Sequence, residues 1–217
     1  ENVNKARSQM HGQVSSDKLQ SSEARTPANI VVVIGSSTGG PKALEAVVSS
    51  IPGTIAASLL IVQHMPPGFT KSLAERLDRV SELTIKEAEE GDRLYPGVAL
   101  VAPGSYHLEL DSLRRVCLTQ SAPVNYVRPS IDVTMESVVS HFQQNTIGVI
   151  LTGMGRDGAH GMALIKRANG ITIAQDQHTS TIYSMPRMVA ENGDADYILP
   201  VNQIGETIGE LAERLKG

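Results

Sequence analysis

The sequence predicts an α/β fold in which a doubly wound, mostly parallel sheet is flanked by helices. Two observations support this prediction. After residue 28, strand-like and helix-like runs alternate along the chain, which is typical of parallel strands joined by helical connections. Residues 30–34 form an unbroken apolar and mostly β-branched run, as expected for a strand buried on both faces. The 217 residues, of which 41% are hydrophobic, suffice for one domain with a sizeable core.

The elements follow from the apolar pattern in chain order. The strand-like runs are residues 30–35, 58–64, 98–102, 147–152, 171–175 and 197–199. The helix-like runs are residues 41–50, 69–80, 132–143, 159–168, 185–192 and 202–215. Residues 106–119 break this rhythm, because two short alternating runs flank a polar turn. They predict a β-hairpin inserted at an edge of the sheet. Residues 87–92 are acidic and are expected to form a solvated loop.

The first 28 residues differ in composition from the rest of the chain. They are rich in Ser, Gln, Lys and Glu and contain few large apolar residues, so they offer little surface for a core. We expect residues 1–28 to be a polar linker or tail, with a linker helix as the alternative, and residues 29–217 to form the domain. Because the chain starts with Glu1 rather than Met, we expect it to be a piece of something longer.

Composition argues against several classes of function. The net charge is −4, aromatic residues make up 3% and Trp is missing, so nucleic acid is not an expected partner. The sequence contains no apolar run long enough to span a bilayer, so we expect no membrane insertion. The single cysteine, Cys117, cannot form an internal disulfide and fits a reducing, cytoplasmic location. Neither H-E-x-x-H nor C-x-x-C occurs, and we expect no metal.

Residues 35–39, Gly-Ser-Ser-Thr-Gly, directly follow the first buried strand and fit the G-x-S-x-G spacing of a nucleophile elbow. Ser37 is the central residue, and glycines two positions away on either side would avoid clashes at a sharp turn. The N–H of Thr38 could then donate to a developing oxyanion. Two alternatives remain open from the residues alone: a phosphate-binding turn at a helix N-terminus, and a flexible loop with a helix cap.

Three strand-like runs end in reactive residues: Ser37 after the first, His64 after the second, and Asp157 shortly after residues 147–152. Because the carboxyl ends of parallel strands share one edge of a sheet, these side chains are expected to meet there. Serine, histidine and aspartate are the residues of base-activated serine attack. His64 could instead simply end its strand, and Asp157 could cap the helix that begins near Gly158.

One further pair of residues competes for the catalytic role. His178 follows the run 171–175 and has Asp176 close by in sequence, so it is a rival base. Separately, Lys71, Arg128, Arg156 and Arg187 lie in or beside the strand-end segments. They could form a basic rim on an acidic domain, or they could be ordinary solvated surface charges.

Several ordered motifs resemble the catalytic domain of the bacterial chemotaxis methylesterases, the CheB type, over about residues 29–215. The motifs are Ile34-Gly-Ser-Ser-Thr-Gly-Gly-Pro, Gln63-His-Met-Pro-Pro-Gly-Phe-Thr, Val101-Ala-Pro-Gly, Arg128-Pro-Ser-Ile-Asp-Val, Leu151-Thr-Gly-Met-Gly-Arg-Asp-Gly-Ala and Met185-Pro-Arg.

The resemblance implies a protein-glutamate methylesterase that hydrolyses γ-glutamyl methyl esters on chemoreceptors and also deamidates receptor glutamines. It assigns Ser37 as nucleophile, His64 as base and Asp157 as the orienting acid. It places the oxyanion at Thr38 and at the backbone amide of Met154. It implies no cofactor, methylated chemoreceptor cytoplasmic helices as partner, and an upstream receiver domain that this chain lacks.

Overall fold

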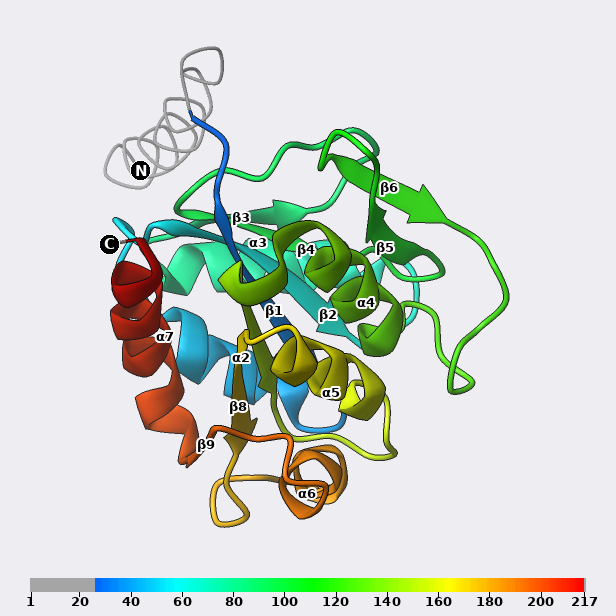
Figure 1. Cartoon of the computed structure of the whole chain (residues 1–217). Coiled ribbons are helices and arrows are strands. Elements are labelled where there is room, and N and C mark those ends of the chain that lie inside the picture. Colours follow the sequence, from blue (N-terminus) through cyan, green and yellow to red (C-terminus); the bar gives the residue numbers. More distant parts are fainter. Residues whose placement is uncertain (1–25, 217) are drawn as a thin grey trace, which may run out of the picture.

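The computed structural model describes residues 26–216, and its central element is a seven-stranded parallel sheet with strand order β3-β4-β2-β1-β7-β8-β9 (Figure 1). Its strands are β1 (Ile30–Ser36), β2 (Ala57–Gln63), β3 (Thr84–Glu87), β4 (Val98–Val101), β7 (Thr146–Ile150), β8 (Ile171–Gln175) and β9 (Tyr197–Leu199). The helices are α2 (Gly40–Val48), α3 (Phe69–Val80), α4 (Ile131–Phe142), η2 (Gln143–Asn145), α5 (Ala159–Arg167), α6 (Ser184–Glu191) and α7 (Val201–Lys216).

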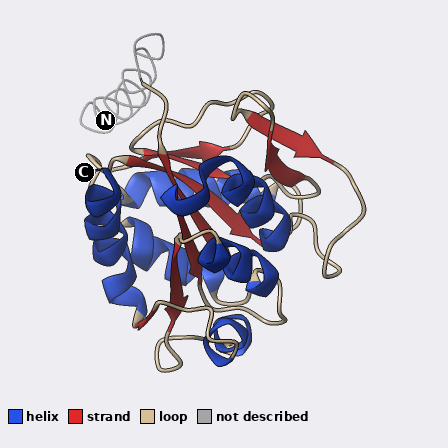
Figure 2. Ribbon diagram, in the orientation of Figure 1, coloured by secondary structure: helices blue, strands red, loops and turns tan. Residues whose placement is uncertain are grey.

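The sheet is covered on both faces, as Figure 2 shows. Side chains of β1 alternate between two cores: Ile30, Val32 and Ile34 pack with α2, α3 and α7, and Val31 and Val33 pack with α4, α5 and α6. This alternation explains why the strand reads as an unbroken apolar run, because both of its faces are buried. The predicted doubly wound α/β fold is therefore confirmed.

The helical connections that follow the strands determine where along the sheet a ligand site can form. Strands β1 and β7 are neighbours, but α2, which follows β1, packs in one core and α5, which follows β7, packs in the other. The chain therefore leaves two adjacent strands toward opposite faces. In open α/β sheets this arrangement opens a crevice at the carboxyl ends of the strands, where ligands bind. Ser37 and residues 151–158 lie at this crevice.

The predicted hairpin is present as β5 (His107–Leu110) and β6 (Val116–Thr119), which pair antiparallel in a sheet of their own beside the main one. It packs on α4: the hydroxyl of Thr134 donates to the Leu108 carbonyl at 2.7 Å, and the Leu110 N–H donates to Ser137 Oγ at 2.8 Å. In Figure 1 it stands at the upper right, next to α4. The hairpin therefore supports the helix whose first residues reach the site.

Strand β3 was not predicted from the sequence. It forms the sheet edge beside β4 and buries only Ile85, whereas its other three residues are partly exposed. Such a short segment with two charged residues has no apolar run, so only pairing with β4 makes it a strand. Glu87, expected in a solvated loop, is the last residue of β3 and accepts a hydrogen bond from buried Thr70 at 2.6 Å.

The predicted tail, residues 1–28, lies almost wholly outside the described residues, and its boundary stays a prediction. Ala28 is buried, and its N–H donates to the Leu94 carbonyl at 2.9 Å. None of the helices within residues 26–216 combines the length and the apolar character needed to cross a bilayer.

Close helix packing beside the crevice generates a stability prediction. Gly161 of α5 lies so close to α4 that a Cβ placed on it would be 2.5 Å from Met135 Cβ. Alanine normally favours a helix over glycine by about 1 kcal/mol. Here Gly161→Ala should instead lower the free energy of unfolding by about 1–3 kcal/mol, because the helices must separate.

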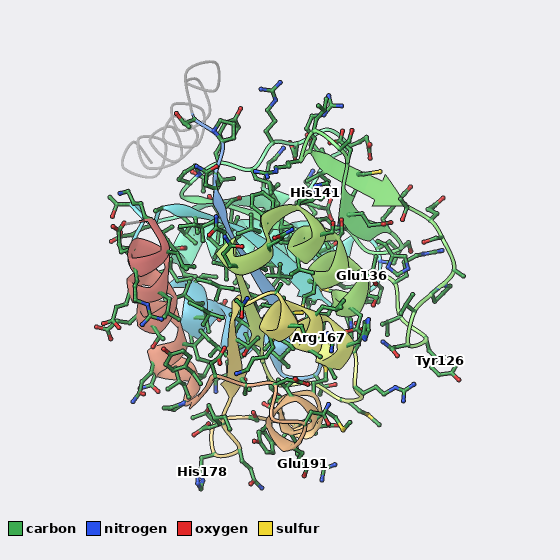
Figure 3. The ribbon with its side chains drawn as sticks, in the orientation of Figure 1. Tyr126, Glu136, His141, Arg167, His178 and Glu191 are labelled. Atoms are coloured by element: carbon green, nitrogen blue, oxygen red, sulfur yellow. The ribbon has the colours of Figure 1, made fainter. Side chains whose placement is uncertain are left out.

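Thermal unfolding would measure this loss at about 2–4 °C per kcal/mol. Glu136→Ala is the matched control, since Glu136 neighbours Met135 on α4 but is exposed (Figure 3). It should change stability by no more than about 0.5 kcal/mol. A Gly161→Ala variant as stable as the native protein would contradict the close packing.

Candidate active site

Backbone pairing brings the three predicted strand ends together. The N–H of His64 donates to the Ser36 carbonyl at 3.1 Å, which holds the end of β2 beside the end of β1. The N–H of Ser37 donates to the Thr152 carbonyl at 3.0 Å, which holds the same turn beside the loop after β7. The predicted convergence of these three segments at one edge of the sheet is therefore confirmed.

The two adjacent serines have different surroundings. Ser36 is fully buried, and its hydroxyl donates to Gln63 Oε1 at 2.7 Å. Ser37 is partly exposed and is the serine whose hydroxyl is available at the crevice. The Gln63 amide also donates to the carbonyls of Ser37 and His64, each at 3.0 Å. Gln63 thus ties the serine turn to the histidine turn. Sequence reasoning missed it, although a polar residue at the end of a buried strand is a usable signal.

The glycines around Ser37 are required by close approach. A Cβ on Gly35 would lie 2.5 Å from Ile131 Cγ2, and a Cβ on Gly39 would lie 2.5 Å from Thr181 Oγ1. Gly39 also has φ of 82°, a conformation that glycine adopts without strain. The predicted steric need for small residues on both sides of Ser37 is confirmed.

His64 and Asp157 form a direct pair: His64 Nε2 lies 2.8 Å from Asp157 Oδ2. Only 11% of the His64 side chain and 3% of the Asp157 side chain are exposed. The pair therefore interacts largely out of contact with water, where charge interactions are strong.

The Asp157 carboxylate accepts four further hydrogen bonds. Oδ1 accepts from Ser130 Oγ at 2.7 Å, Asn125 Nδ2 at 2.9 Å and the Asp132 N–H at 3.3 Å, and Oδ2 accepts from the Ile131 N–H at 2.6 Å. Burial alone would raise the pKa of Asp157. The hydrogen bonds from His64, Ser130, Ile131 and Asn125 outweigh it and hold the pKa below its ordinary value. Asp157 is therefore ionised near neutral pH.

The alternative that Asp157 caps the helix after Gly158 is wrong. Gly158 is the N-cap of α5, and the described residues provide no side-chain hydrogen bond for this cap. The Asp157 carboxylate instead accepts the first N–H groups of α4, from Ile131 and Asp132. A carboxylate at a helix N-terminus is favoured by the free N–H groups and by the helix dipole. Because Asp157 closely precedes α5 in sequence, it could be expected to cap α5, whereas it caps α4.

A second buried carboxylate lies beside the first. Asn125 Nδ2 bridges Asp157 Oδ1 and Asp132 Oδ2, at 2.9 and 2.8 Å. Asp132 Oδ1 also accepts the Gly161 N–H at 2.8 Å. Burial raises the pKa of Asp132 and the Asp157 charge raises it further, although the bonds from Gly161 and Asn125 act in the opposite direction. The surroundings therefore favour the ionised form of Asp157, the residue that contacts His64, more than that of Asp132.

A fully buried histidine supports the segment before α4. His107 Nδ1 accepts the Ser130 N–H at 3.1 Å, and His107 Nε2 lies 3.2 Å from the Ala122 carbonyl. Because Nδ1 must accept, the proton is on Nε2. His107 thus orients Ser130, whose hydroxyl donates to Asp157. Neither His107 nor Asn125 follows the carboxyl end of a strand in the parallel sheet, so the strand-end rule could not identify them.

Ser37 is close to the loop after β7 but is not bonded to the histidine. A Cβ placed on Gly153 would lie 2.8 Å from Ser37 Cβ. Among the described residues, no hydrogen bond joins the Ser37 hydroxyl to the His64 ring. Such contacts are often long without substrate.

The N–H groups of Thr38 and Met154 have no acceptor within residues 26–216, so both are available to an incoming oxygen.

A hollow of about 540 Å³ opens beside the His64–Asp157 pair. It is lined by one segment with Pro123 and residues 125–127, by a second segment of residues 154–157, and by His64. Ser37 is not among the lining residues, but its turn is bonded to Thr152 shortly before the second segment. Within the described part of the chain, no group of three or more His, Cys, Asp or Glu side chains could hold a metal ion.

The rival base does not fit the site, whereas the basic rim stays a prediction. His178 is exposed and projects from the bottom of the molecule in Figure 3, while Asp176 accepts hydrogen bonds from Thr179. Arg128 Nη1 donates to the carbonyls of Gln120 and Ser121 at 2.9 and 2.7 Å, which holds the guanidinium against its own loop but leaves its charge in place, so its part in the rim stays a prediction. Lys71, Arg156 and Arg187 are exposed, and for them the rim stays a prediction.

Comparison with known proteins identifies the family. Residues 32–208 match the family model described as CheB methylesterase. A protein-glutamate methylesterase/protein-glutamine glutaminase of Symbiobacterium thermophilum is 51% identical over 82% of this chain and 49% of its own length. The protein of the same name from Pyrococcus horikoshii is 45% identical over 92% of this chain and 55% of its own. The chain thus spans about half the length of these relatives.

A solved structure shows the same fold. The Thermotoga maritima CheB methylesterase catalytic domain superimposes with a TM-score of 0.81 at 47% sequence identity. The match covers 84% of this chain and 98% of that domain. On the evidence of sequence and fold together, this chain belongs to the CheB methylesterase family.

Proposed function

We propose that this chain is a serine hydrolase that cleaves γ-glutamyl methyl esters on chemoreceptors, and deamidates receptor glutamines, through Ser37, His64 and Asp157. The observation that carries the proposal is the buried 2.8 Å contact between His64 and Asp157 next to the exposed side of the Ser37 turn. Relatives that bear the methylesterase and glutaminase name support the reaction class. The methylated helices of chemoreceptors on the cytoplasmic side are the proposed partner.

We propose a different role for each of the two ring nitrogens of His64. Ionised Asp157 can only accept, so Nε2 carries the proton in their hydrogen bond. The lone pair is therefore on Nδ1, which is the proposed base for the Ser37 hydroxyl. The roles of the two nitrogens are exchanged relative to the serine-protease template, although the logic of an oriented imidazole is the same.

In the proposed acylation step, Ser37 Oγ forms a bond to the ester carbonyl carbon while its proton moves to His64 Nδ1. The N–H groups of Thr38 and Met154 donate to the resulting oxyanion. The carbon–oxygen bond to the methoxy group then breaks while His64 passes the proton to the departing oxygen, which leaves as methanol. Asp157 stabilises the transient imidazolium, because its hydrogen bonds keep it negatively charged.

In the second half of the reaction, His64 takes a proton from water, whose oxygen attacks the glutamyl–serine ester. The bond between the acyl carbon and Ser37 Oγ then breaks, His64 returns the proton to that oxygen, and glutamate and the free enzyme are released. For a glutamine substrate the same sequence expels ammonia in place of methanol.

A phosphate-binding turn would require neither His64 nor Asp157, whereas the esterase requires both, and their direct contact favours the esterase. The deciding experiment measures methanol release from membranes that carry methylated chemoreceptors. Release by the native chain supports the proposal, and saturable nucleotide binding without methanol release would favour the phosphate-binding alternative.

Ser37→Ala should lower methanol release by several orders of magnitude, because the nucleophile is lost. Ser36→Ala is the matched control from the same turn. It should keep substantial activity but lose about 1–3 kcal/mol of stability, because Gln63 Oε1 loses its buried donor. Kinetics and thermal unfolding of both variants would check this. If Ser36 proves essential and Ser37 dispensable, the assignment of the nucleophile is wrong.

Asp157→Asn should reduce kcat by about 10⁴-fold, because His64 would be held in the wrong tautomer. It should also lower the free energy of unfolding by about 1–3 kcal/mol, since both oxygens of Asp157 accept hydrogen bonds and either amide orientation sets N–H against a donor. Turnover and unfolding would be measured together at a temperature where the variant is folded.

Asp176→Asn serves as the control, because Asp176 is the partner of the rival base and lies outside the hollow. It should retain native turnover. Near-native turnover of the Asp157→Asn variant would argue that Asp157 only supports the structure at the start of α4.

A further inference from the structure

A short two-residue turn lines part of the hollow. Val124 and Val127 exchange backbone hydrogen bonds of 3.1 and 3.0 Å and enclose Asn125 and Tyr126 between them. Both enclosed residues have positive φ, 52° for Asn125 and 66° for Tyr126. Two-residue turns of this kind strongly prefer Asn-Gly, because the second position also needs the left-handed conformation.

Asn125 is well suited to its place. Asparagine tolerates the left-handed region better than most residues. Its amide also donates to Asp157 Oδ1 and Asp132 Oδ2, at 2.9 and 2.8 Å. The turn is therefore held directly against the carboxylate that orients His64.

Tyr126 has no such compensation. A bulky residue with positive φ is strained relative to glycine. Its side chain is fully exposed (102%), and its hydroxyl forms no hydrogen bond with any residue in 26–216. Figure 3 shows it at the tip of the loop between β6 and α4, directed away from the protein. Glycine would fit this turn better, so the folded chain gains nothing from the ring.

Tyr126 lies beside the reactive pair. It lines the same hollow as His64, Asp157 and Met154. Met154 is also exposed, with 74% of its surface accessible. Two large apolar side chains thus project into solvent beside the reactive pair. Tyrosine is enriched among the residues that dominate protein–protein binding, and methionine adapts to varied surfaces.

We propose that Tyr126, together with Met154, recognises the protein substrate by packing on the polypeptide on either side of the ester-bearing side chain. This inference rests on the proposed function. The occupant is the substrate protein, because an ester side chain that reaches His64 brings its polypeptide to the hollow that Tyr126 and Met154 also line. The strain at Tyr126 is then offset by contacts made only in the complex, as strained residues at functional sites often are.

The test compares stability with substrate affinity in the Tyr126→Gly variant. Its Tm should equal or exceed that of the native chain, because glycine relieves the strained φ. Its KM for methylated receptor membranes should rise roughly five- to tenfold, the size typical of a lost tyrosine anchor. Tyr126→Phe keeps the ring and should keep KM within about twofold.

Gln143→Gly is the matched control. Gln143 is exposed, has φ of 46° and lies at the opposite end of α4 from Asp157. Its replacement should likewise leave Tm equal or higher, but it should not alter KM. This variant separates the relief of strain from the loss of substrate contact.

The outcomes are distinct. If the native chain releases no methanol from these membranes, the proposed function fails and this inference falls with it. If the native chain is active but Tyr126→Gly has native KM, this inference alone fails. A lower Tm in Tyr126→Gly would assign the ring a structural role and overturn the proposal. A native dimer that Tyr126→Gly converts to a monomer would identify a second copy as the occupant and overturn it too.

Discussion

The carboxylate of Asp157 is the interaction on which the candidate site depends. It gathers hydrogen bonds from three separate parts of the chain: the end of β2 through His64, the loop at Asn125, and the start of α4 through the Ser130 hydroxyl and the first N–H groups of the helix. A buried carboxylate is stable only when such donors surround it. The same donors keep it negatively charged, and that charge orients the imidazole. The same hydrogen bonds therefore stabilise the structure around Asp157 and keep its carboxylate ionised.

The remaining parts of the site are positioned by buried polar side chains that join neighbouring loops. Gln63 links the carbonyls after β1 and β2, and His107 links the hairpin to Ser130. Thr152 extends this arrangement, because its hydroxyl donates to the Thr38 carbonyl and accepts the Ile182 N–H. Such bonds are strong in a dry environment and costly to leave unmade. They hold the irregular loops in fixed positions, as the backbone hydrogen bonds between strands hold the sheet.

The hollow differs from this interior, in which buried polar side chains form hydrogen bonds. Its walls carry exposed apolar side chains at Tyr126 and Met154, and Tyr126 adopts a backbone conformation that disfavours its bulk. Local disagreement between residue and conformation is expected mainly at functional sites, because elsewhere it only lowers stability. The turn at residues 125–126 connects both aspects: Asn125 contacts the carboxylate of Asp157, and Tyr126 faces solvent.

The alternation of strands and helices, and hence the fold, follows from the amino-acid sequence alone. The position of Ser37, His64 and Asp157 after strand ends follows from it too. Both depend on local pattern, since burial on two faces selects apolar β-branched runs and parallel strands end at one edge.

Other features became apparent only in the folded structure. Asp157 contacts α4 rather than α5, Asn125 bridges two carboxylates, and Arg128 bonds to its own loop. Residues 84–87 form a strand. The physical reason is that most of these features arise from contacts between residues far apart in the chain, as when Ile131 donates to Asp157. Local propensity carries no information about which distant group will supply a hydrogen-bond partner.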